Sequence, residues 1–264
     1  ARGRVTVRAE RWEGAGNVYL LVDEDALPRP LDAARARAIC AALGGDGILE
    51  VRRGGEGDVA MRIWNPDGSE SEACGNGARM VARWLAEQTG QHDVRIATAA
   101  GLLACTVDGE RVAAQMAPAR LDGAQYRPTA DPFPYAHTFV SVGNPHVVIP
   151  VDDVDAFPLE AVGPELEHHP WFPERANVEV VAPIDRHRVR MRVWERGVGL
   201  TRACGTGACA VAVAAVANGT ADSPVAVELP GGELVIEVGE DGAVTMHGPA
   251  ARVEHVEIPD ELIA

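Results

Sequence analysis

A six-residue pattern, Ala-Cys-Gly-x-Gly-Ala, occurs twice in the chain and constrains its fold more than any other feature. The copies span residues 73–78 and 203–208, and an apolar run typical of a helix follows each. Glycines let a backbone approach a ligand closely. The start of a helix offers unpaired N–H groups and a positive dipole end, which can hold a carboxylate and lower the pKa of a cysteine. The repeat therefore indicates two thiols, Cys74 and Cys204, that face one substrate.

The residues upstream of each copy also follow a common order. A Gly-Asn turn comes first, at Asn17 and at Asn144. A strand ending in a polar residue follows, and Asn65 and Glu195 each lie nine residues before the cysteine of their half. Internal repeats fix an architecture, so we predict two similar α/β halves. We expect the ligand at their interface, where both helix starts can point at it.

Period-2 alternation and turn residues predict the strands, and apolar runs closed by glycine or asparagine predict the helices. The expected strands are 5–7, 18–22, 48–51, 59–64, 94–98, 102–107, 112–116, 138–142, 147–149, 178–181, 189–194, 225–229, 234–238 and 243–247. The expected helices are 31–43, 75–88, 159–166 and 205–217, and residues 117 to about 135, rich in Pro, Ala and Asp, form the crossing between halves.

Two matched thiols suit a racemase that uses two bases. One thiolate removes a Cα proton, and a thiol on the opposite face returns one, so the stereocentre inverts. A thiol has a reference pKa of about 8.5, which a helix end lowers and burial raises, so one partner can be ionised while the other is not. Backbone N–H groups of both loops would hold the carboxylate charge. Cys40, Cys105 and Cys209 lack this setting and are predicted to fill the core.

Other polar residues are weaker candidates. His146 follows Asn144 in a turn and could tune a thiol. Glu195 stands beside Arg196 at a strand end, where its repeat position favours a role in the site over a surface ion pair. The pair His168-His169 is expected to be solvated. The sequence has no zinc-ligand spacing and no acidic residue placed for dinucleotide binding, so we expect no metal and no nucleotide cofactor.

Composition excludes several classes of function. All 24 basic residues are arginine, so the chain cannot form the lysine Schiff base of a pyridoxal phosphate enzyme. A net charge of -15 argues against nucleic acid as a partner. Five cysteines without a regular framework indicate reduced thiols and a cytoplasmic protein. The absence of an apolar run long enough to span a bilayer predicts no membrane association.

Seven short segments together match one known family. They are Gly16-Asn17, Asn65-Pro66-Asp67-Gly68-Ser69-Glu70, Ala73-Cys74-Gly75-Asn76-Gly77-Ala78-Arg79, Gly143-Asn144-Pro145-His146, Asn177-Val178-Glu179, Glu195-Arg196-Gly197 and Ala203-Cys204-Gly205-Thr206-Gly207-Ala208-Cys209. On these residues the chain resembles the diaminopimelate epimerases over nearly its whole length. The family usually has an acidic residue in place of Val18 and an amide near Gly47.

The resemblance implies an epimerase without cofactor, often dimeric, that interconverts LL- and meso-diaminopimelate in lysine and cell-wall precursor biosynthesis. It implies Cys74 and Cys204 as the acid/base pair, with Cys204 taking the proton from the LL isomer, and His146 and Glu195 as groups that tune the thiols. The implied substrate-binding residues are Asn17, Asn65, Gly75, Asn76, Asn144, Asn177, Glu195, Arg196, Gly205 and Thr206.

The fold prediction is therefore α/β (α+β). Each half is a mostly antiparallel sheet wrapped around a central helix, and the active site lies in the cleft between the halves. The first half is assigned residues 1–122 with about 251–264, because chain termini often meet, and the second half residues 123–250.

Three other functions are compatible with the residues. A related racemase would act on another amino acid, which a panel of L-amino acids would reveal. A thiol hydrolase would use Cys74 as nucleophile and His146 as base, but it leaves the second Cys-Gly loop unexplained. A ligand-binding module would show no turnover and no deuterium incorporation at Cα in heavy water.

Overall fold

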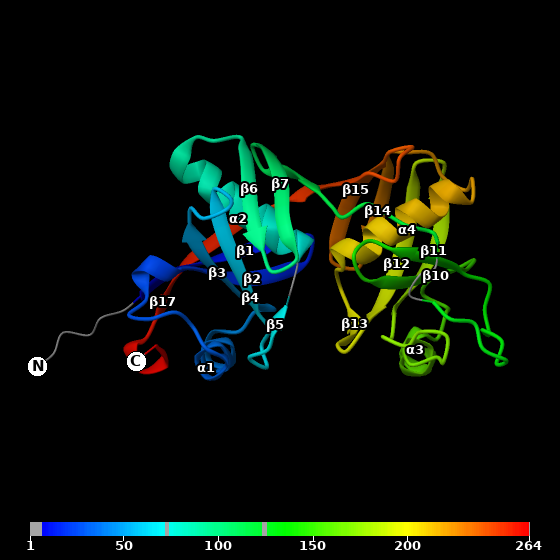
Figure 1. Ribbon diagram of the computed structural model, residues 1–264, viewed down its shortest axis with the longest axis horizontal. Helices are drawn as coiled ribbons and strands as arrows, with labels where there is room; N and C mark the ends of the chain where they lie inside the picture. The colour runs from blue at the N-terminus through cyan, green and yellow to red at the C-terminus, as the bar shows by residue number, and fades with distance from the viewer. Residues whose placement is uncertain (1–6, 72–73, 123–125, 264) are drawn as a thin grey trace, which may run out of the picture. The chain divides into compact units, whose positions relative to one another are not determined.

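The computed structural model of the protein describes residues 7–71, 74–122 and 126–263. The chain divides into two compact units (Figure 1). Unit 1 comprises Ala1–Ala114 and Gly248–Ala264, and unit 2 comprises Gln115–His247. Most of the strand expected at 5–7, Ala73 of the first motif and the start of the second half at 123 lie outside the described residues. The domain boundaries expected from the sequence stay predictions.

Unit 1 is a sheet with the strand order β17-β1-β2-β3-β4-β6-β7-β8, in which only the pairs β2–β3 and β4–β6 are parallel. The short β5 adds to β4. Its elements are β1 (Val7–Gly14), β2 (Asn17–Asp23), α1 (Ala33–Leu43), β3 (Gly47–Arg53), β4 (Val59–Trp64), β5 (Glu70–Ser71), α2 (Gly75–Thr89), β6 (Asp93–Thr98), β7 (Gly101–Asp108), β8 (Arg111–Gln115) and β17 (Ala251–Ile258). Two 3₁₀ turns, Glu24–Ala26 and Asp260–Leu262, complete it.

Unit 2 has the strand order β9-β10-β11-β12-β14-β15-β16, in which β10–β11 and β12–β14 are parallel and β13 adds to β12. Its elements are β9 (Thr138–Ser141), β10 (Pro145–Pro150), α3 (Leu159–Glu167), β11 (Asn177–Asp185), β12 (Arg188–Glu195), β13 (Gly199–Thr201), α4 (Gly205–Ala217), β14 (Val225–Leu229), β15 (Gly232–Val238) and β16 (Val244–Pro249).

The two units repeat one topology, element by element. The order β-β-α-β-β-β-α-β-β-β runs from β1 to β8 and again from β9 to β16, with the parallel pairs at equivalent places. Among the strands of the described residues, β17 alone stands outside the repeat. The predicted fold, two pseudo-symmetric halves with mostly antiparallel sheets, is confirmed.

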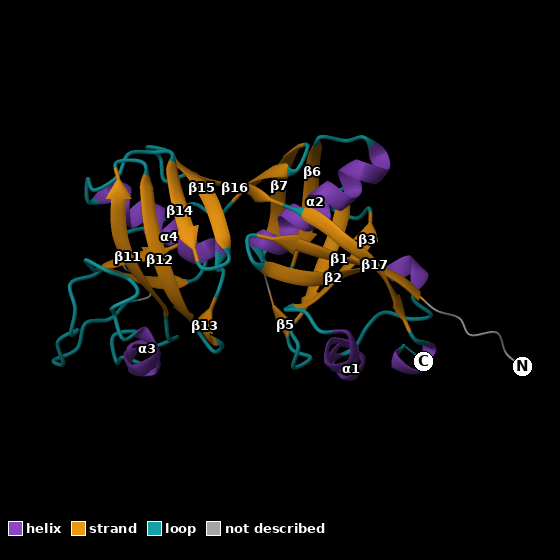
Figure 2. Cartoon of the chain, turned by 180° about the vertical axis from the view of Figure 1, so that it is seen from behind, coloured by secondary structure: helices purple, strands orange, loops and turns teal. Residues whose placement is uncertain are grey.

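A helix lies at the centre of each unit, with the strands of the sheet curved around it (Figure 2). In unit 1, α2 contacts β1, β2, β3, β4, β6 and β7, and in unit 2, α4 contacts β9, β10, β11, β12, β14 and β15. The sequence of α4 is apolar nearly all round because every face of it is covered, and Gly207 to Ala215 are all buried. The curved sheet therefore surrounds the central helix of each unit, and the Cys-Gly motif lies at the N-terminus of that helix.

Some boundaries differ from those expected. Helix α1 begins at Ala33, not at Leu31, because Asp32 is its N-cap and accepts a hydrogen bond from the Arg35 N–H. Strand β1 extends to Gly14, and β17 was not predicted. Most residues of β17 are exposed, so β17 lacks the apolar alternation by which a half-buried strand is found. Among the described residues, no helix combines the length and apolar character of a membrane span.

Candidate active site

The thiol of Cys74 caps the central helix of unit 1. Cys74 has extended backbone angles, φ -146° and ψ 108°, and its Sγ accepts a hydrogen bond from the Gly77 N–H at 3.2 Å. The sulfur also lies 3.6 Å from the hydroxyl of Tyr19, a residue of β2 that is 8% exposed. The repeat motif therefore places a thiol at a helix N-terminus, as the sequence predicts.

Amide side chains join the first turn of α2 to the start of β2. The Asn76 amide donates to Asn17 Oδ1 at 2.6 Å. Asn17 in turn donates to Asp46 Oδ2 at 3.2 Å, and the Val18 N–H donates to the same oxygen at 2.8 Å. Asp46 was not predicted, and it places a carboxylate beside Val18, where the family usually carries an acidic residue. Asn65 lies in the turn after β4 and donates to Ser69 Oγ at 2.9 Å.

The thiol of Cys204 caps the central helix of unit 2 with nearly the same backbone, φ -143° and ψ 109°. Its Sγ accepts from the Gly207 N–H at 3.3 Å and lies 3.6 Å from Thr206 Oγ1. Cys204 is buried, with 7% of its surface exposed. The second thiol thus stands at the same structural position as the first.

The electrostatic surroundings of Cys204 raise the pKa of its thiol well above the usual value. Burial is the main cause, and the negative charges of Glu195 and Glu179 add to it. The helix N-terminus acts in the opposite direction, so here desolvation outweighs the dipole. Glu195, at the end of β12, also has a raised pKa because partial burial desolvates it and Glu179 is close, although the Thr201 hydroxyl donates to it.

His146 is fully buried on β10 and bridges two side chains. Its Nδ1 lies 2.6 Å from Glu179 Oε1, and its Nε2 lies 2.9 Å from Asn144 Oδ1. Asn144 donates to Thr206 Oγ1 at 3.4 Å, which completes a chain from Glu179 to the Cys204 loop. Glu179 belongs to the matched segment Asn177-Val178-Glu179, but no role was predicted for it. A glutamate in the middle of the apolar run Val178 to Val181 was the signal that could have found it.

The turn that carries Arg196 is held by two buried side chains. Asn177 Oδ1 accepts from the Arg196 N–H at 2.9 Å, and the Asn177 amide donates to Pro145 O at 3.0 Å. Glu167 Oε1 accepts from the Gly197 N–H at 2.9 Å. The guanidinium of Arg196 donates to Glu174 O at 3.1 Å. Asn177 therefore positions Arg196 through its backbone.

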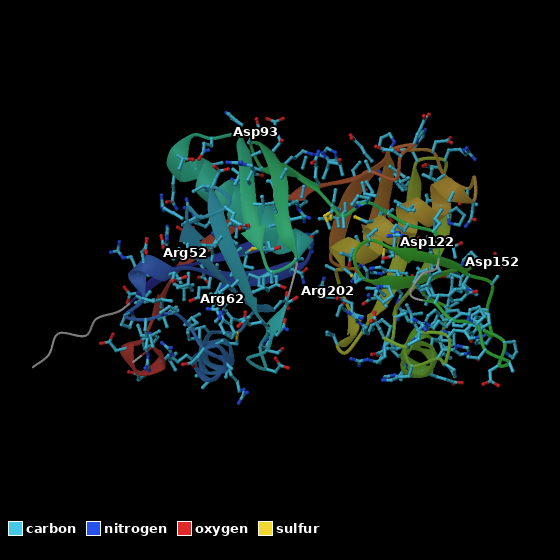
Figure 3. The ribbon with its side chains drawn as sticks, in the orientation of Figure 1. Arg52, Arg62, Asp93, Asp122, Asp152 and Arg202 are labelled. Atoms are coloured by element: carbon cyan, nitrogen blue, oxygen red, sulfur yellow. The ribbon has the colours of Figure 1, made fainter. Side chains whose placement is uncertain are left out.

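A tryptophan precedes the polar residue at the strand end in each unit. The indole N–H of Trp64 donates to Glu50 Oε2 at 2.9 Å, and that of Trp194 donates to Glu167 Oε2 at 2.9 Å. In unit 1 the Arg62 guanidinium, on β4 in Figure 3, lies over the Trp64 ring at 4.6 Å. Buried glutamates thus fix the ends of β4 and β12, from which Asn65 and Glu195 extend.

Strand register identifies which residues are equivalent in the two units. Tyr19 pairs with Gly47, as His146 pairs with Asn177. Ile48 pairs with Trp64, as Val178 pairs with Trp194. Counted along the strands from these pairs, Tyr19 is the counterpart of His146, Leu49 of Glu179, and Asn65 of Glu195. The structure thus assembles one set of predicted residues around each thiol, in unit 1 Asn17, Asn76 and Cys74, and in unit 2 Asn144, His146, Glu195, Cys204 and Thr206.

Two further predictions about histidine and cysteine have clear outcomes. Cys40, Cys105 and Cys209 are buried, as expected of core residues. The expectation that His168-His169 is solvated is wrong for His169, which is 9% exposed and packs on Phe133 with ring centroids 5.0 Å apart. Within the ranges 7–71, 74–122 and 126–263, no three His, Cys, Asp or Glu residues cluster in a way that could hold a metal ion.

Solved structures share this fold at low sequence identity. A Bacillus anthracis protein of the PhzF family, described as a phenazine biosynthesis protein, aligns with a TM-score of 0.73 and 18% identity over 96% of this chain and 99% of its own. A hydroxyproline epimerase from Agrobacterium vitis, with trans-4-hydroxy-L-proline bound, aligns with a TM-score of 0.70 and 15% identity over 96% of this chain and 91% of its own. The fold is therefore that of the PhzF and proline racemase-like proteins.

Sequence comparison gives the family. The diaminopimelate epimerase family model matches residues 12–121 and 138–253. A diaminopimelate epimerase of Synechococcus elongatus is 44% identical, covering 94% of this chain and 97% of its own, and one of Rhodospirillum centenum is 43% identical, covering 96% and 92%. The chain belongs to the diaminopimelate epimerase family, and it is an isomerase.

Proposed function

We propose that this protein interconverts LL- and meso-diaminopimelate by moving a proton at Cα between two thiols, in lysine and cell-wall precursor biosynthesis. Membership of the diaminopimelate epimerase family supports the assignment of diaminopimelate as the substrate. The observation that carries the mechanism is the repeated cap: each unit presents a cysteine Sγ as the N-cap of its central helix, with backbone angles that agree within a few degrees. A reaction that inverts a stereocentre needs one proton acceptor and one proton donor, and the two caps supply them.

The roles of the two thiols follow from acid–base chemistry. The thiolate of one cysteine removes the Cα proton, and the thiol of the other delivers a proton to the opposite face. The negative charge that develops on the substrate carboxylate is stabilised by N–H groups in the first turns, at Gly75-Asn76 and Gly205-Thr206, because a helix leaves these groups without an intrahelical partner. No cofactor enters this scheme.

The remaining predicted residues bind the substrate or adjust the thiols. Asn17, Asn65, Asn144 and Asn177 supply amide groups, and Arg196 supplies the cation that pairs with the distal carboxylate of diaminopimelate. His146 and Glu195 adjust the protonation of the Cys204 half. We further propose that the protein works in the cytoplasm as a homodimer, because its thiols are reduced in that compartment and the resemblance implies a dimer.

Isotope incorporation in heavy water tests the reaction directly. Incubation with LL-diaminopimelate should yield the meso isomer with deuterium at the inverted Cα, as followed by mass spectrometry and chiral chromatography. A panel of L-amino acids that includes proline and hydroxyproline tests the rival racemase function, because a hydroxyproline epimerase and a probable proline racemase share this fold. Faster exchange with one of these amino acids than with diaminopimelate would replace the substrate assignment, and no exchange with diaminopimelate or with any of them would refute the proposed reaction.

A further inference from the structure

A second carboxylate, Glu179, lies beside Cys204 and has no part in the function proposed above. Glu179 is fully buried on β11, between Val178 and Val180. Its Oε1 lies 2.6 Å from His146 Nδ1, and its Oε2 has no hydrogen-bond partner. Burying a carboxylate with an unsatisfied oxygen costs free energy, and packing alone would favour an apolar side chain at this position of the strand. The presence of Glu179 therefore points to a functional role.

The surroundings of Gly207 show that Glu179 lies close to the thiol. A methyl group added at Gly207 would lie 2.9 Å from Glu179 Oε1 and 3.1 Å from Cys204 Sγ. The carboxylate and the sulfur therefore border the same small space under the first turn of α4. The charged groups that act on Cys204 are Glu195 from β12 and Glu179 from β11, and His146 from β10 lies beside both carboxylates.

Unit 1 shows what the same position looks like without a charge. A methyl group added at Gly77 would lie 2.8 Å from Leu49 Cδ2 and 3.4 Å from Cys74 Sγ. Leu49 is the register counterpart of Glu179 and is also fully buried. One fold thus holds a leucine beside one thiol and a glutamate beside the other.

We propose that Glu179 is a positioning residue that holds His146 against Asn144 and keeps Cys204 as a protonated thiol before substrate binds. This role of Glu179 rests on the proposed function, because it assigns Cys204 as the proton donor in the enzyme without substrate. This form accepts the isomer whose Cα proton faces Cys74, and the LL isomer, whose proton the resemblance assigns to Cys204, reacts with the form in which Cys204 is ionised and Cys74 is protonated. The raised pKa of Cys204, caused by burial and by the two carboxylates, agrees with this role.

Thiol alkylation measures this property without any turnover. The protein is treated with iodoacetamide over a range of pH, and the alkylation of Cys74 and Cys204 is read separately from their peptides by mass spectrometry. Glu179→Gln removes the charge and keeps the shape, so the alkylation midpoint of Cys204 should fall by about one pH unit. At a pH below both midpoints, alkylation of Cys204 should then be about tenfold faster. The Cys74 curve should not move.

The counterpart position supplies the controls. Leu49→Gln introduces the same amide in unit 1 and should leave the Cys204 midpoint in place. Leu49→Glu places a carboxylate beside the other thiol and should raise the Cys74 midpoint, so it tests the proposal even if Glu179→Gln does not fold. An unmoved Cys204 midpoint in folded Glu179→Gln, or an unmoved Cys74 midpoint in folded Leu49→Glu, would overturn the proposal. An inactive protein with shifted midpoints would refute only the epimerase function.

Discussion

Cys74 and Cys204 sit on matching backbone, but the side chains around them differ in charge. Around Cys74 the counterpart positions hold Tyr19, Leu49 and Asn65, none of which is charged at neutral pH. Around Cys204 the same positions hold His146, Glu179 and Glu195. The repeat therefore fixes where the sulfur lies, and the side chains decide how readily it ionises. Two halves that share a fold thus place different charges beside their thiols, as the proposed proton donor and proton acceptor require.

The largest effect is expected when either thiol is removed. Cys74→Ser and Cys204→Ser should each lower epimerisation by about 10²–10⁴-fold, because a hydroxyl is rarely ionised near neutral pH. Each variant should still eliminate halide from a β-halogenated analogue, but from opposite stereoisomers, since elimination needs a base on one face only. Cys40→Ala, in the core of unit 1, is the control and should retain activity. Elimination of the same isomer by both variants would contradict the division of roles.

The second effect concerns Arg196, whose counterpart in unit 1 is Pro66. Arg196→Met should raise KM for diaminopimelate, with a loss of about 2–5 kcal/mol if the arginine pairs with the distal carboxylate. Steady-state kinetics with both isomers measures this change. Arg186→Met removes an exposed ion pair with Asp222 and should leave KM unchanged. Equal KM values for the Arg196→Met variant and the original protein would remove Arg196 from the substrate site.

A matched pair of glycine substitutions compares the space beside the two sulfurs. Gly207→Ala forces its methyl against a carboxylate that His146 holds, whereas Gly77→Ala meets the end of a leucine side chain that can move. Overpacking costs about 1–3 kcal/mol, and we expect the larger loss at Gly207. Denaturant unfolding of both variants measures the difference. A larger loss for Gly77→Ala would show that Glu179 is more mobile than Leu49.

The smallest effect is a stability change that depends on pH. Burial and the charge of Glu179 raise the pKa of Glu195. Glu195 therefore does not change the free energy of unfolding below the ordinary carboxyl pKa, and it lowers that free energy as the pH rises from there through the raised pKa of the folded state. Glu195→Gln should therefore raise Tm by about 2–4 °C at pH 8, the effect of about 1 kcal/mol in a chain of this length. The gain should vanish near pH 4. The half-buried Glu228, whose pKa its hydrogen bond to Arg188 lowers, should give no gain when changed to Gln.

The sequence predicted the parts of the structure that a pattern can encode. The repeated Cys-Gly loops, the helices that follow them and most strands are visible as periodic apolar residues and glycines. Strand β17 was missed because exposed residues carry no such period. Glu179 was passed over because its meaning depends on Gly207 and His146, which the fold brings to it from distant positions. The helix N-terminus lowers the pKa of Cys204 and burial raises it, and the sequence does not show how deeply this thiol is buried.

Strand β17 closes unit 1 only after unit 2 has been made. Residues 115–247 form unit 2 without interruption, whereas β1 pairs with a strand that lies more than two hundred residues later in the chain. During synthesis, unit 2 can fold as it emerges from the ribosome. In unit 1, one edge of β1 stays unpaired until β17 has been synthesised. We therefore expect the completion of unit 1, which holds Cys74, to be the slow, long-range step of folding.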